Sequence, residues 1–329
     1  MKKIHLKNKL LIEFIAVLLV LNISTLVLLL YFLYGKIDNS AARIRNQEKI
    51  GACYMTMNNP FYSILNNEVR AVVEENGDIL ITRNPGLDSV KQQEEIYDLI
   101  DLGVKALIIT PVDWKAIEPA LRKAKGQGIA IVIVDSNVYD DELVDCTVVS
   151  DNYEAGVQCA EELMEQQESA RIVVLKHSVA KSSIDRTAGF EETLKKNPNY
   201  TIVERVECNG QLEVAMPAME KVLDTGVAFD TIFALNDPSA LGAMAALEEK
   251  NCLEGIEVYS VDGSPEGKAM VKEGMMEATS AQFPTEIGRM AAERMYDILT
   301  GKMVETEILV PVTLVTSENI GDYEIDRWQ

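Results

Sequence analysis

The chain has 329 residues and a formal net charge of −21 at pH 7, which argues against a protein that binds nucleic acid through a basic surface. Residues 1–36 hold five lysines and one glutamate, so the remaining 26 basic and 51 acidic side chains give residues 37–329 a charge of −25. The five cysteines are odd in number and include no CxxC pair. A disulfide framework is therefore not indicated.

The N-terminus predicts a membrane anchor. Four lysines among the first nine residues precede an apolar run from Phe14 to Tyr34. A cleavable signal peptide has an apolar region of roughly 7–15 residues, whereas a spanning helix needs about 20. We expect an uncleaved signal anchor over residues 1–36 and a linker over 37–48, with cleavage after Ser40-Ala41-Ala42 as the alternative. The lysines predict a cytoplasmic N-terminus, a single-pass location in the cell membrane and an extracytoplasmic bulk of the chain.

Six residues at the first strand-to-helix junction combine amides with aromatic rings. The run Met57-Asn58-Asn59-Pro60-Phe61-Tyr62 follows a strand-like segment and precedes a segment with apolar residues at helical spacing. Asn59 can cap that helix, and Pro60 fits its first turn. Such a turn is typical of an ordinary helix start, and it can also bind a small polyol.

Short apolar runs then alternate with amphipathic segments. The runs occupy residues 106–110, 130–135, 171–175, 231–236 and 257–262. Continuous hydrophobicity indicates strands that are buried on both faces, as in a parallel sheet flanked by helices. The sequence therefore predicts a doubly wound α/β architecture.

Several of these runs end in a polar residue: Thr110, Asp135, Asn236 and Asp262. Each alone is typical of a helix cap or a turn. Ligands of open α/β sheets bind outside the carboxyl ends of the strands. The recurrence of polar residues at the same structural step therefore indicates a binding edge.

Eight motifs in order resemble one family. The chain from Lys49 to about Thr316 is similar to the sugar-binding receptors of the type I periplasmic binding proteins, most of all to their ribose-binding branch. The motifs lie at residues 58–62, 103–109, 134–136, 150–152, 185–190, 236–242, 261–267 and 281–284.

The resemblance implies two doubly wound parallel-sheet lobes that are joined by a three-strand hinge and preceded by the transmembrane helix. The N-terminal lobe would contain residues 49–150 and 283–310, and the C-terminal lobe residues 151–282 and 311–318. Residues 319–329 would form a C-terminal tail. The ligand would lie between the lobes, which close around it.

The resemblance also implies which residues bind the ligand. The first lobe would contribute Asn59, Phe61, Tyr62 and Asp135, and the second Asn152, Arg186, Asn236 and Asp262, with Gln282 at a hinge crossing. Carboxylates can accept hydrogen bonds from sugar hydroxyls, Arg donates, and amides do both. No catalytic residue, metal ligand or cofactor is implied.

Two positions depart from the family pattern. Ser136 stands where the ribose branch has an Arg after the strand-end Asp, and Gly210 where that branch has an aromatic residue on the second lobe. A strong donor and one side of an aromatic sandwich are thus missing, which fits a larger or less hydroxylated ligand than ribose. Trp114 is interpreted as a partly buried packing residue, with the cleft mouth as an alternative position.

The leading hypothesis is a membrane-tethered receptor that binds a monosaccharide or related polyol and passes it to an ABC-type importer. The alternative is a sensing subunit that signals to a membrane histidine kinase or chemoreceptor. A repressor of the lactose-repressor family is disfavoured, because an apolar segment stands in place of a helix-turn-helix. An enzyme is disfavoured because the only histidines are His5 and His177 and no catalytic motif appears. The soluble part is expected to be a monomer.

Overall fold

The computed structural model describes residues 18–19, 22–30 and 47–328. Residues 18–19 and 22–30 are helical, and within the described ranges no helix combines the length and the apolar character needed to cross a membrane. Most of the predicted anchor and linker lies outside these ranges, so both stay predictions. Met1–Glu48 and Lys49–Gln329 are separate units, and the description below concerns the second unit alone.

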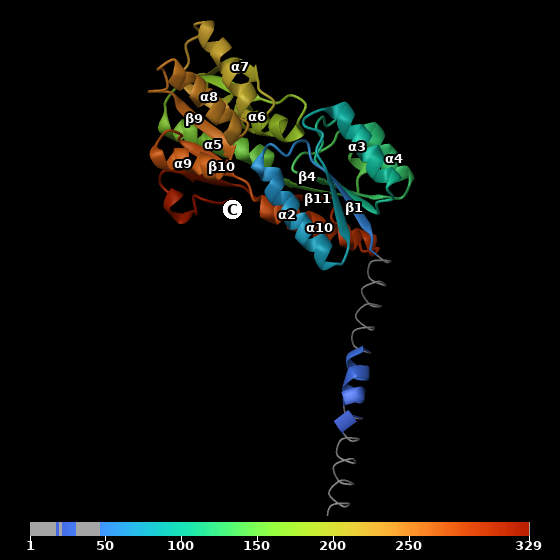
Figure 1. The fold of residues 1–329 in the computed structure, drawn as a ribbon. Coiled ribbons are helices and arrows are strands. Elements are labelled where there is room, and N and C mark those ends of the chain that lie inside the picture. Colours follow the sequence, from blue (N-terminus) through green and yellow to red (C-terminus); the bar gives the residue numbers. More distant parts are fainter. Residues whose placement is uncertain (1–17, 20–21, 31–46, 329) are drawn as a thin grey trace, which may run out of the picture. The chain divides into compact units, whose positions relative to one another are not determined.

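The first lobe is built on a six-stranded sheet in the order β11-β5-β4-β3-β1-β2 (Figure 1). Each neighbouring pair is parallel. Its strands are β1 (Lys49–Cys53), β2 (Ile79–Arg83), β3 (Ala106–Ile109), β4 (Ala130–Val134), β5 (Cys146–Ser150) and β11 (Glu307–Val310). Its helices are α2 (Pro60–Glu75), α3 (Ser89–Asp101), α4 (Glu118–Gly126), α10 (Pro284–Leu299) and the short η1 (Asp141–Leu143).

The second lobe repeats this plan in the order β12-β10-β9-β8-β6-β7. Only β12 departs from it, because it runs antiparallel to β10. The strands are β6 (Ala170–Lys176), β7 (Tyr200–Glu207), β8 (Thr231–Ala234), β9 (Glu257–Asp262), β10 (Ala278–Ala281) and β12 (Thr313–Thr316). The helices are α5 (Asn152–Gln166), α6 (Lys181–Leu194), α7 (Leu212–Asp224), α8 (Asp237–Glu249), α9 (Pro265–Glu273) and η2 (Ile320–Asp322).

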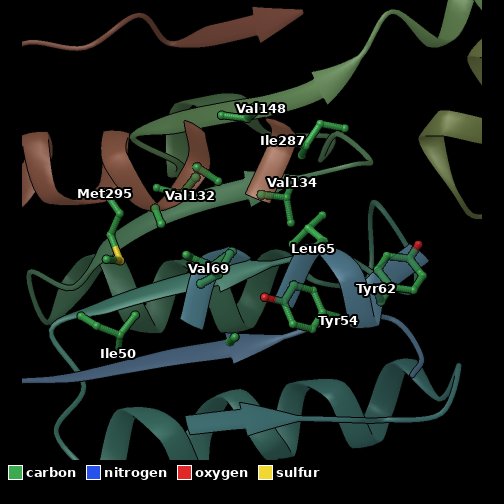
Figure 2. Packing of buried hydrophobic residues seen from close by; sticks show 14 of the residues in the cluster. Ile50, Tyr54, Tyr62, Leu65, Val69, Val132, Val134, Val148, Ile287 and Met295 are labelled. Carbon is green, nitrogen blue, oxygen red and sulfur yellow. The ribbon is translucent and has the colours of Figure 1, made fainter. Parts of the chain in front are cut away.

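Both faces of each sheet are covered, which explains the continuous apolar runs. In β3, Ile108 belongs to the core under α2 and α10, and Ile109 belongs to the core under α3 and α4. Figure 2 shows the first of these cores, where Leu65 and Ile287 lie against the strand residue Val134. The second lobe has equivalent cores under α7 and α8 and under α5 and α6.

The sheet order shows how the lobes are connected. The chain passes between the sheets after β5, between β10 and α10, and between β11 and β12. The predicted architecture of two α/β lobes with parallel sheets is confirmed. Because β4 and β9 occupy the same place in their sheets, their ends are equivalent positions in the two lobes.

Candidate functional site

The carboxyl ends of strands from both sheets line a hollow between the lobes. Its empty space, counted together with the part open to solvent, is about 420 Å³. The lining residues are Met55, Asn59, Phe61, Tyr62, Asp135, His177, Ala180, Ser182, Arg186, Asn209, Gly210, Gln211, Leu235, Asn236, Asp262 and Gln282.

The start of α2 brings the first lobe's aromatic rings to the hollow. The Asn59 side-chain oxygen accepts a hydrogen bond from the Phe61 backbone N–H at 2.9 Å, and Pro60 begins the helix. This cap fixes the first turn. Phe61 and Tyr62 lie edge to face with ring centroids 5.3 Å apart, and the Tyr62 hydroxyl donates to Asp135 Oδ2 at 2.8 Å.

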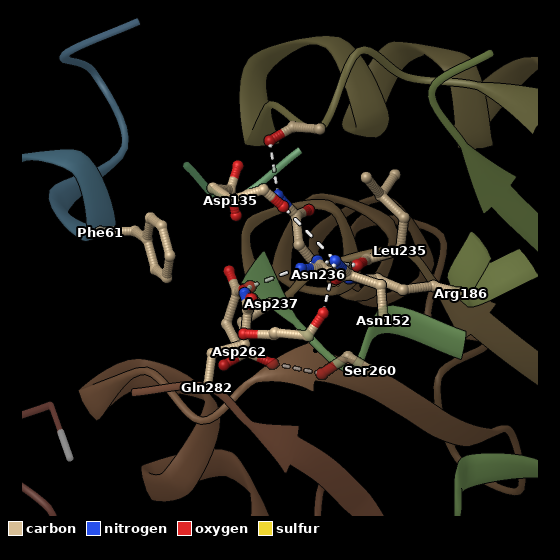
Figure 3. Close-up of polar contacts among 12 residues, drawn as sticks. Phe61, Asp135, Asn152, Arg186, Leu235, Asn236, Asp237, Ser260, Asp262 and Gln282 are labelled. Atoms are coloured by element: carbon tan, nitrogen blue, oxygen red, sulfur yellow. Dashed lines mark hydrogen bonds and ion pairs between the residues drawn. The ribbon is translucent and has the colours of Figure 1, made fainter. Parts of the chain in front are cut away.

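Arg186 on α6 is the main cation of the hollow, and it is held by three partners (Figure 3). Its Nε donates to Asn152 Oδ1 and its Nη1 to the Leu235 carbonyl, both at 2.8 Å. Nη1 also lies 3.5 Å from Asp262 Oδ1. Only 4% of Arg186 is exposed, so these bonds keep the guanidinium in one orientation.

Two glycines allow α5 and α6 to approach closely enough for this arrangement. A Cβ on Gly156 would lie 2.0 Å from the Arg186 carbonyl oxygen, and one on Gly189 would lie 2.0 Å from the Tyr153 carbonyl oxygen. Any side chain at either position would push the helices apart. Asn152, in the first turn of α5, is thereby placed beside Arg186.

Asp262 and Gln282 present two buried acceptors without partners. Gln282 Nε2 donates to Asp262 Oδ1 at 2.7 Å, and Asp262 Oδ2 and Gln282 Oε1 form no hydrogen bond within the described chain. Asp262 is 2% exposed and Gln282 is 2% exposed. Buried polar atoms are nearly always paired in folded proteins, so these two oxygens mark a place for a donor.

The two strand-end aspartates have strained backbones and raised pKa values. Their φ angles are +66° at Asp135 and +138° at Asp262, and such conformations persist at sites where the surroundings enforce them. Burial raises the pKa of Asp135, although Arg186 and the Tyr62 hydroxyl oppose the shift. Burial raises the pKa of Asp262 well above its ordinary value, against the effect of Arg186.

Asn236, which caps α8, is held in place by hydrogen bonds within the lobe. Its amide nitrogen donates to the Gly210 carbonyl at 3.0 Å, and its oxygen accepts from the backbone and the hydroxyl of Ser239. Gly210 lines the hollow at φ +67°. Because a Cβ there would lie 3.2 Å from Asn236 Nδ2, the backbone and a close neighbour both favour glycine at this position.

Eight of the nine residues predicted to contact a ligand line the hollow. The exception is Asn152, which lies behind Arg186 and orients the guanidinium. Trp114 does not line the hollow; its backbone N–H donates to the Val179 carbonyl at 3.0 Å, and its ring packs on Tyr139.

The sequence reasoning did not identify several residues of the site. His177 follows β6 directly. The expectation that polar residues after strands lie at the binding edge would therefore have identified it as well. Asp237 gives support from beneath: it is fully buried and accepts hydrogen bonds from Ser260, Ser264 and Thr279. An acidic residue in the first turn of a helix, as Asp237 is in α8, gives no sequence signal for such a network.

The C-terminal tail also reaches the site. It leaves the second lobe after β12, and the ring of Trp328 lies 5.6 Å from that of Phe61 on the first lobe, at 71°. Lys268 of α9, fully buried, donates to the carbonyls of Glu324 and Arg327 at 2.6 Å each. The tail thus connects the two lobes beside the hollow.

Among the described residues, no group of histidine, cysteine and acidic side chains could hold a metal ion. The site instead consists of hydrogen-bonding groups and one aromatic face. Such a set can hold a polar molecule of low molecular mass.

Comparison with known proteins agrees with this description. The chain is 30% identical over 271 residues to the ribose import binding protein RbsB of Bacillus subtilis, covering 82% of this chain and 87% of that protein. It is similar to an ABC transporter solute binding protein of Mycobacterium smegmatis with bound glycerol, with TM-score 0.80, 28% identity, and coverage of 86% and 100%. A Caulobacter myo-inositol binding protein gives TM-score 0.78 at 25% identity, with coverage of 83% and 95%.

The match to a family extends over most of the second unit. Residues 50–303 match the periplasmic binding protein domain. The family consists of solute-binding proteins of ABC transporters, which confirms the prediction that the chain is not an enzyme. With its two lobes, the hollow between them and this match, the chain belongs to the periplasmic binding protein family.

Proposed function

We propose that this protein is a membrane-tethered extracytoplasmic receptor that binds a monosaccharide or related polyol between its lobes and delivers it to an ABC-type importer. The observation that carries the proposal is the pair of buried oxygens without partners, Asp262 Oδ2 and Gln282 Oε1. Leaving such atoms unpaired is unfavourable. Two hydroxyl groups of a bound polyol would satisfy both.

The other lining groups complement the remaining parts of a polyol. Arg186 Nη2 and the side-chain nitrogen of Asn59 form no hydrogen bond within the described chain, so both are free to donate to ligand oxygens. Phe61 presents an aromatic ring to the hollow. Ribose, glycerol and myo-inositol, named with the relatives above, belong to the same chemical class.

The membrane tether rests on the sequence of the first 36 residues. Their apolar run has the length of a spanning segment and follows a cluster of lysines. Such a segment would hold the lobes at the outer face of the membrane, beside an importer. Alkaline extraction of membranes from cells that express the full chain tests this: the protein should stay with the lipid fraction, and release into the supernatant would contradict the tether.

Calorimetry with the full chain in detergent tests ligand binding. Pentoses, hexoses and polyols are titrated, and at least one should bind and raise the melting temperature. Asp262→Asn should weaken that binding, because the amide offers only one acceptor atom, whereas the exposed Asp224→Asn should leave it unchanged. The absence of binding across the whole panel would refute the proposed ligand class.

Sensing is the second candidate function, and the same apolar N-terminal segment favours it, since a fixed tether suits a receptor that signals to a neighbour. Crosslinking of the full chain in native membranes separates the two. Recovery of a permease supports delivery, and recovery of a histidine kinase or chemoreceptor supports sensing.

A further inference from the structure

The charges around the hollow do not balance. Apart from Tyr62, the titratable residues of its lining are Asp135, Asp262, Arg186 and His177. Burial lowers the pKa of His177, which leaves its imidazole neutral at pH 7. Asp262 is paired with Arg186 at 3.5 Å. Asp135 is left without a cation of its own.

The elements around Asp135 supply no further positive charge. Its only side-chain partner in the described chain is the neutral Tyr62 hydroxyl, on Oδ2. The next residue, Ser136, turns its hydroxyl toward the second lobe, where it accepts from the Ser182 N–H at 3.1 Å. Lys181 at the start of α6 forms an ion pair with Asp185.

The deeper acidic group is accounted for separately. Asp237 accepts hydrogen bonds from three neutral residues, and Lys268 lies close enough to feel its charge. Lys268 donates to the tail carbonyls of Glu324 and Arg327 and forms no ion pair with Asp237 in the described chain. Arg186 and Lys268 thus face three buried carboxylates, those of Asp135, Asp237 and Asp262, and the one ion pair among these described groups joins Arg186 to Asp262. The excess negative charge of the site resides on Asp135, which is 4% exposed.

We propose that the natural ligand is an amino sugar or amino polyol whose single ammonium group lies against Asp135. A buried carboxylate without a cation is unfavourable, and a ligand ammonium supplies the missing charge with three donors. Asp135 Oδ1 makes no hydrogen bond within the described chain and is the expected acceptor. The ligand hydroxyls face Asp262 and Gln282. This inference rests on the proposed function and names the ligand class of the same site.

Calorimetry on matched ligands tests the inference, with the full chain in detergent at a pH where the amines are protonated. The first set is glucose, glucosamine and N-acetylglucosamine; the second is the galactose series; the third is myo-inositol and its monoamino derivative. In at least one set the amine should bind roughly tenfold or more tightly than the neutral parent, which corresponds to about 1.4 kcal/mol. The N-acetyl compound, which lacks the charge, should show no such gain.

Two variants locate the effect. Asp135→Asn keeps the shape of the side chain and should abolish the preference for the amine. Ser136→Arg places a guanidinium next to Asp135 and should shift the preference to the neutral parent. An unchanged preference in both variants, each checked for a cooperative melt, would place the charge recognition elsewhere and overturn the inference.

The outcomes separate this inference from the proposed function. Binding of neutral polyols with no gain for any amine overturns the inference and leaves the function standing. Failure of every neutral and amino compound to bind overturns both.

Discussion

Asp135 and Asp262 occupy equivalent positions in the two lobes, yet they have different surroundings. Asp135 follows β4 and Asp262 ends β9, which are matching strands of the two sheets. Asp262 forms an ion pair with Arg186 and accepts from the Gln282 amide, whereas the Asp135 carboxylate forms no ion pair in the described chain, accepts from the Tyr62 hydroxyl, and interacts with Arg186 from a greater distance. The repeated fold determines where each carboxylate lies, and the neighbouring side chains determine its charge balance.

The ends of β3 and β8 show the same contrast. Leu235, directly after β8, lines the hollow, and its carbonyl accepts from Arg186 Nη1. Thr110, after β3, is fully buried and does not line it; its carbonyl accepts from Gln92, and its hydroxyl has no partner in the described chain. Equivalent backbone positions therefore do not guarantee equivalent roles in binding.

Removing Arg186 should lower the unfolding free energy the most, because Asp262 then has no ion pair, as is already the case for Asp135. Arg186→Ala leaves Asp262 and Asn152 without their shared donor, and breaking a buried ion pair in this way costs about 3–5 kcal/mol of unfolding free energy. Urea denaturation of the full chain in detergent measures the loss. Arg122→Ala, which removes an exposed ion pair with Glu118, is the matched control and should leave the midpoint unchanged. A midpoint for Arg186→Ala equal to that of the control would show that Asp262 does not depend on this cation.

Tyr62→Phe tests the first lobe's side of the comparison. The change removes the hydroxyl that donates to Asp135 and keeps the ring against Phe61. Because a charged acceptor loses its donor, we expect a loss of about 1–3 kcal/mol. Tyr139→Phe, at a residue that is 63% exposed, serves as the control. If Tyr62→Phe is as stable as wild type, the hydroxyl is not a significant partner of Asp135.

The sequence pattern predicted the positions of these carboxylates, and the family resemblance placed Tyr62, Arg186 and Gln282 in the same site, but neither predicted which side chains bond to each other. Apolar runs locate strands, and the polar residue after each run must lie at the binding edge of a parallel sheet, so Asp135 and Asp262 could be found from pattern alone. The partners depend on tertiary packing. Asn152 supports Arg186 because Gly156 lets α5 and α6 approach, and Trp328 meets Phe61 because a buried lysine holds the tail. No local pattern encodes either contact.

The pH dependence of stability should reveal the raised pKa of both aspartates. Both folded pKa values are raised above the ordinary value of about 3.9, so the folded state binds the extra proton more readily than the unfolded state does. Each group therefore stabilises the fold as pH falls through its raised pKa toward about 3.9, and this contribution is lost as pH rises. Each accounts for at most about 1.4 kcal/mol per pH unit.

The measurement is the difference in unfolding free energy between wild type and each Asp→Asn variant, taken across acidic to neutral pH. Wild type should lose stability relative to Asp262→Asn as pH rises. The same loss should appear in the comparison with Asp135→Asn, since burial raises the pKa of both carboxylates. A difference that does not change with pH would mean that the carboxylate is ionised throughout.

The smallest expected effect on stability comes from changing Trp328 in the C-terminal tail. The tail follows the second lobe, and the Trp328 ring packs on Phe61 of the first lobe. Trp328→Ala removes the edge-to-face contact with Phe61, and such a pair contributes about 0.5–1.5 kcal/mol. If the contact holds the lobes together around a ligand, the loss should appear mainly as faster ligand dissociation in stopped-flow measurements, and Trp328→Phe should restore the wild-type rate.

Because the chain has only two tryptophans, a Trp114→Phe background leaves Trp328 as the sole indole reporter. Its fluorescence should then change when ligand binds, whereas an unchanged signal and an unchanged dissociation rate would show that the tail plays no part in closure of the two lobes.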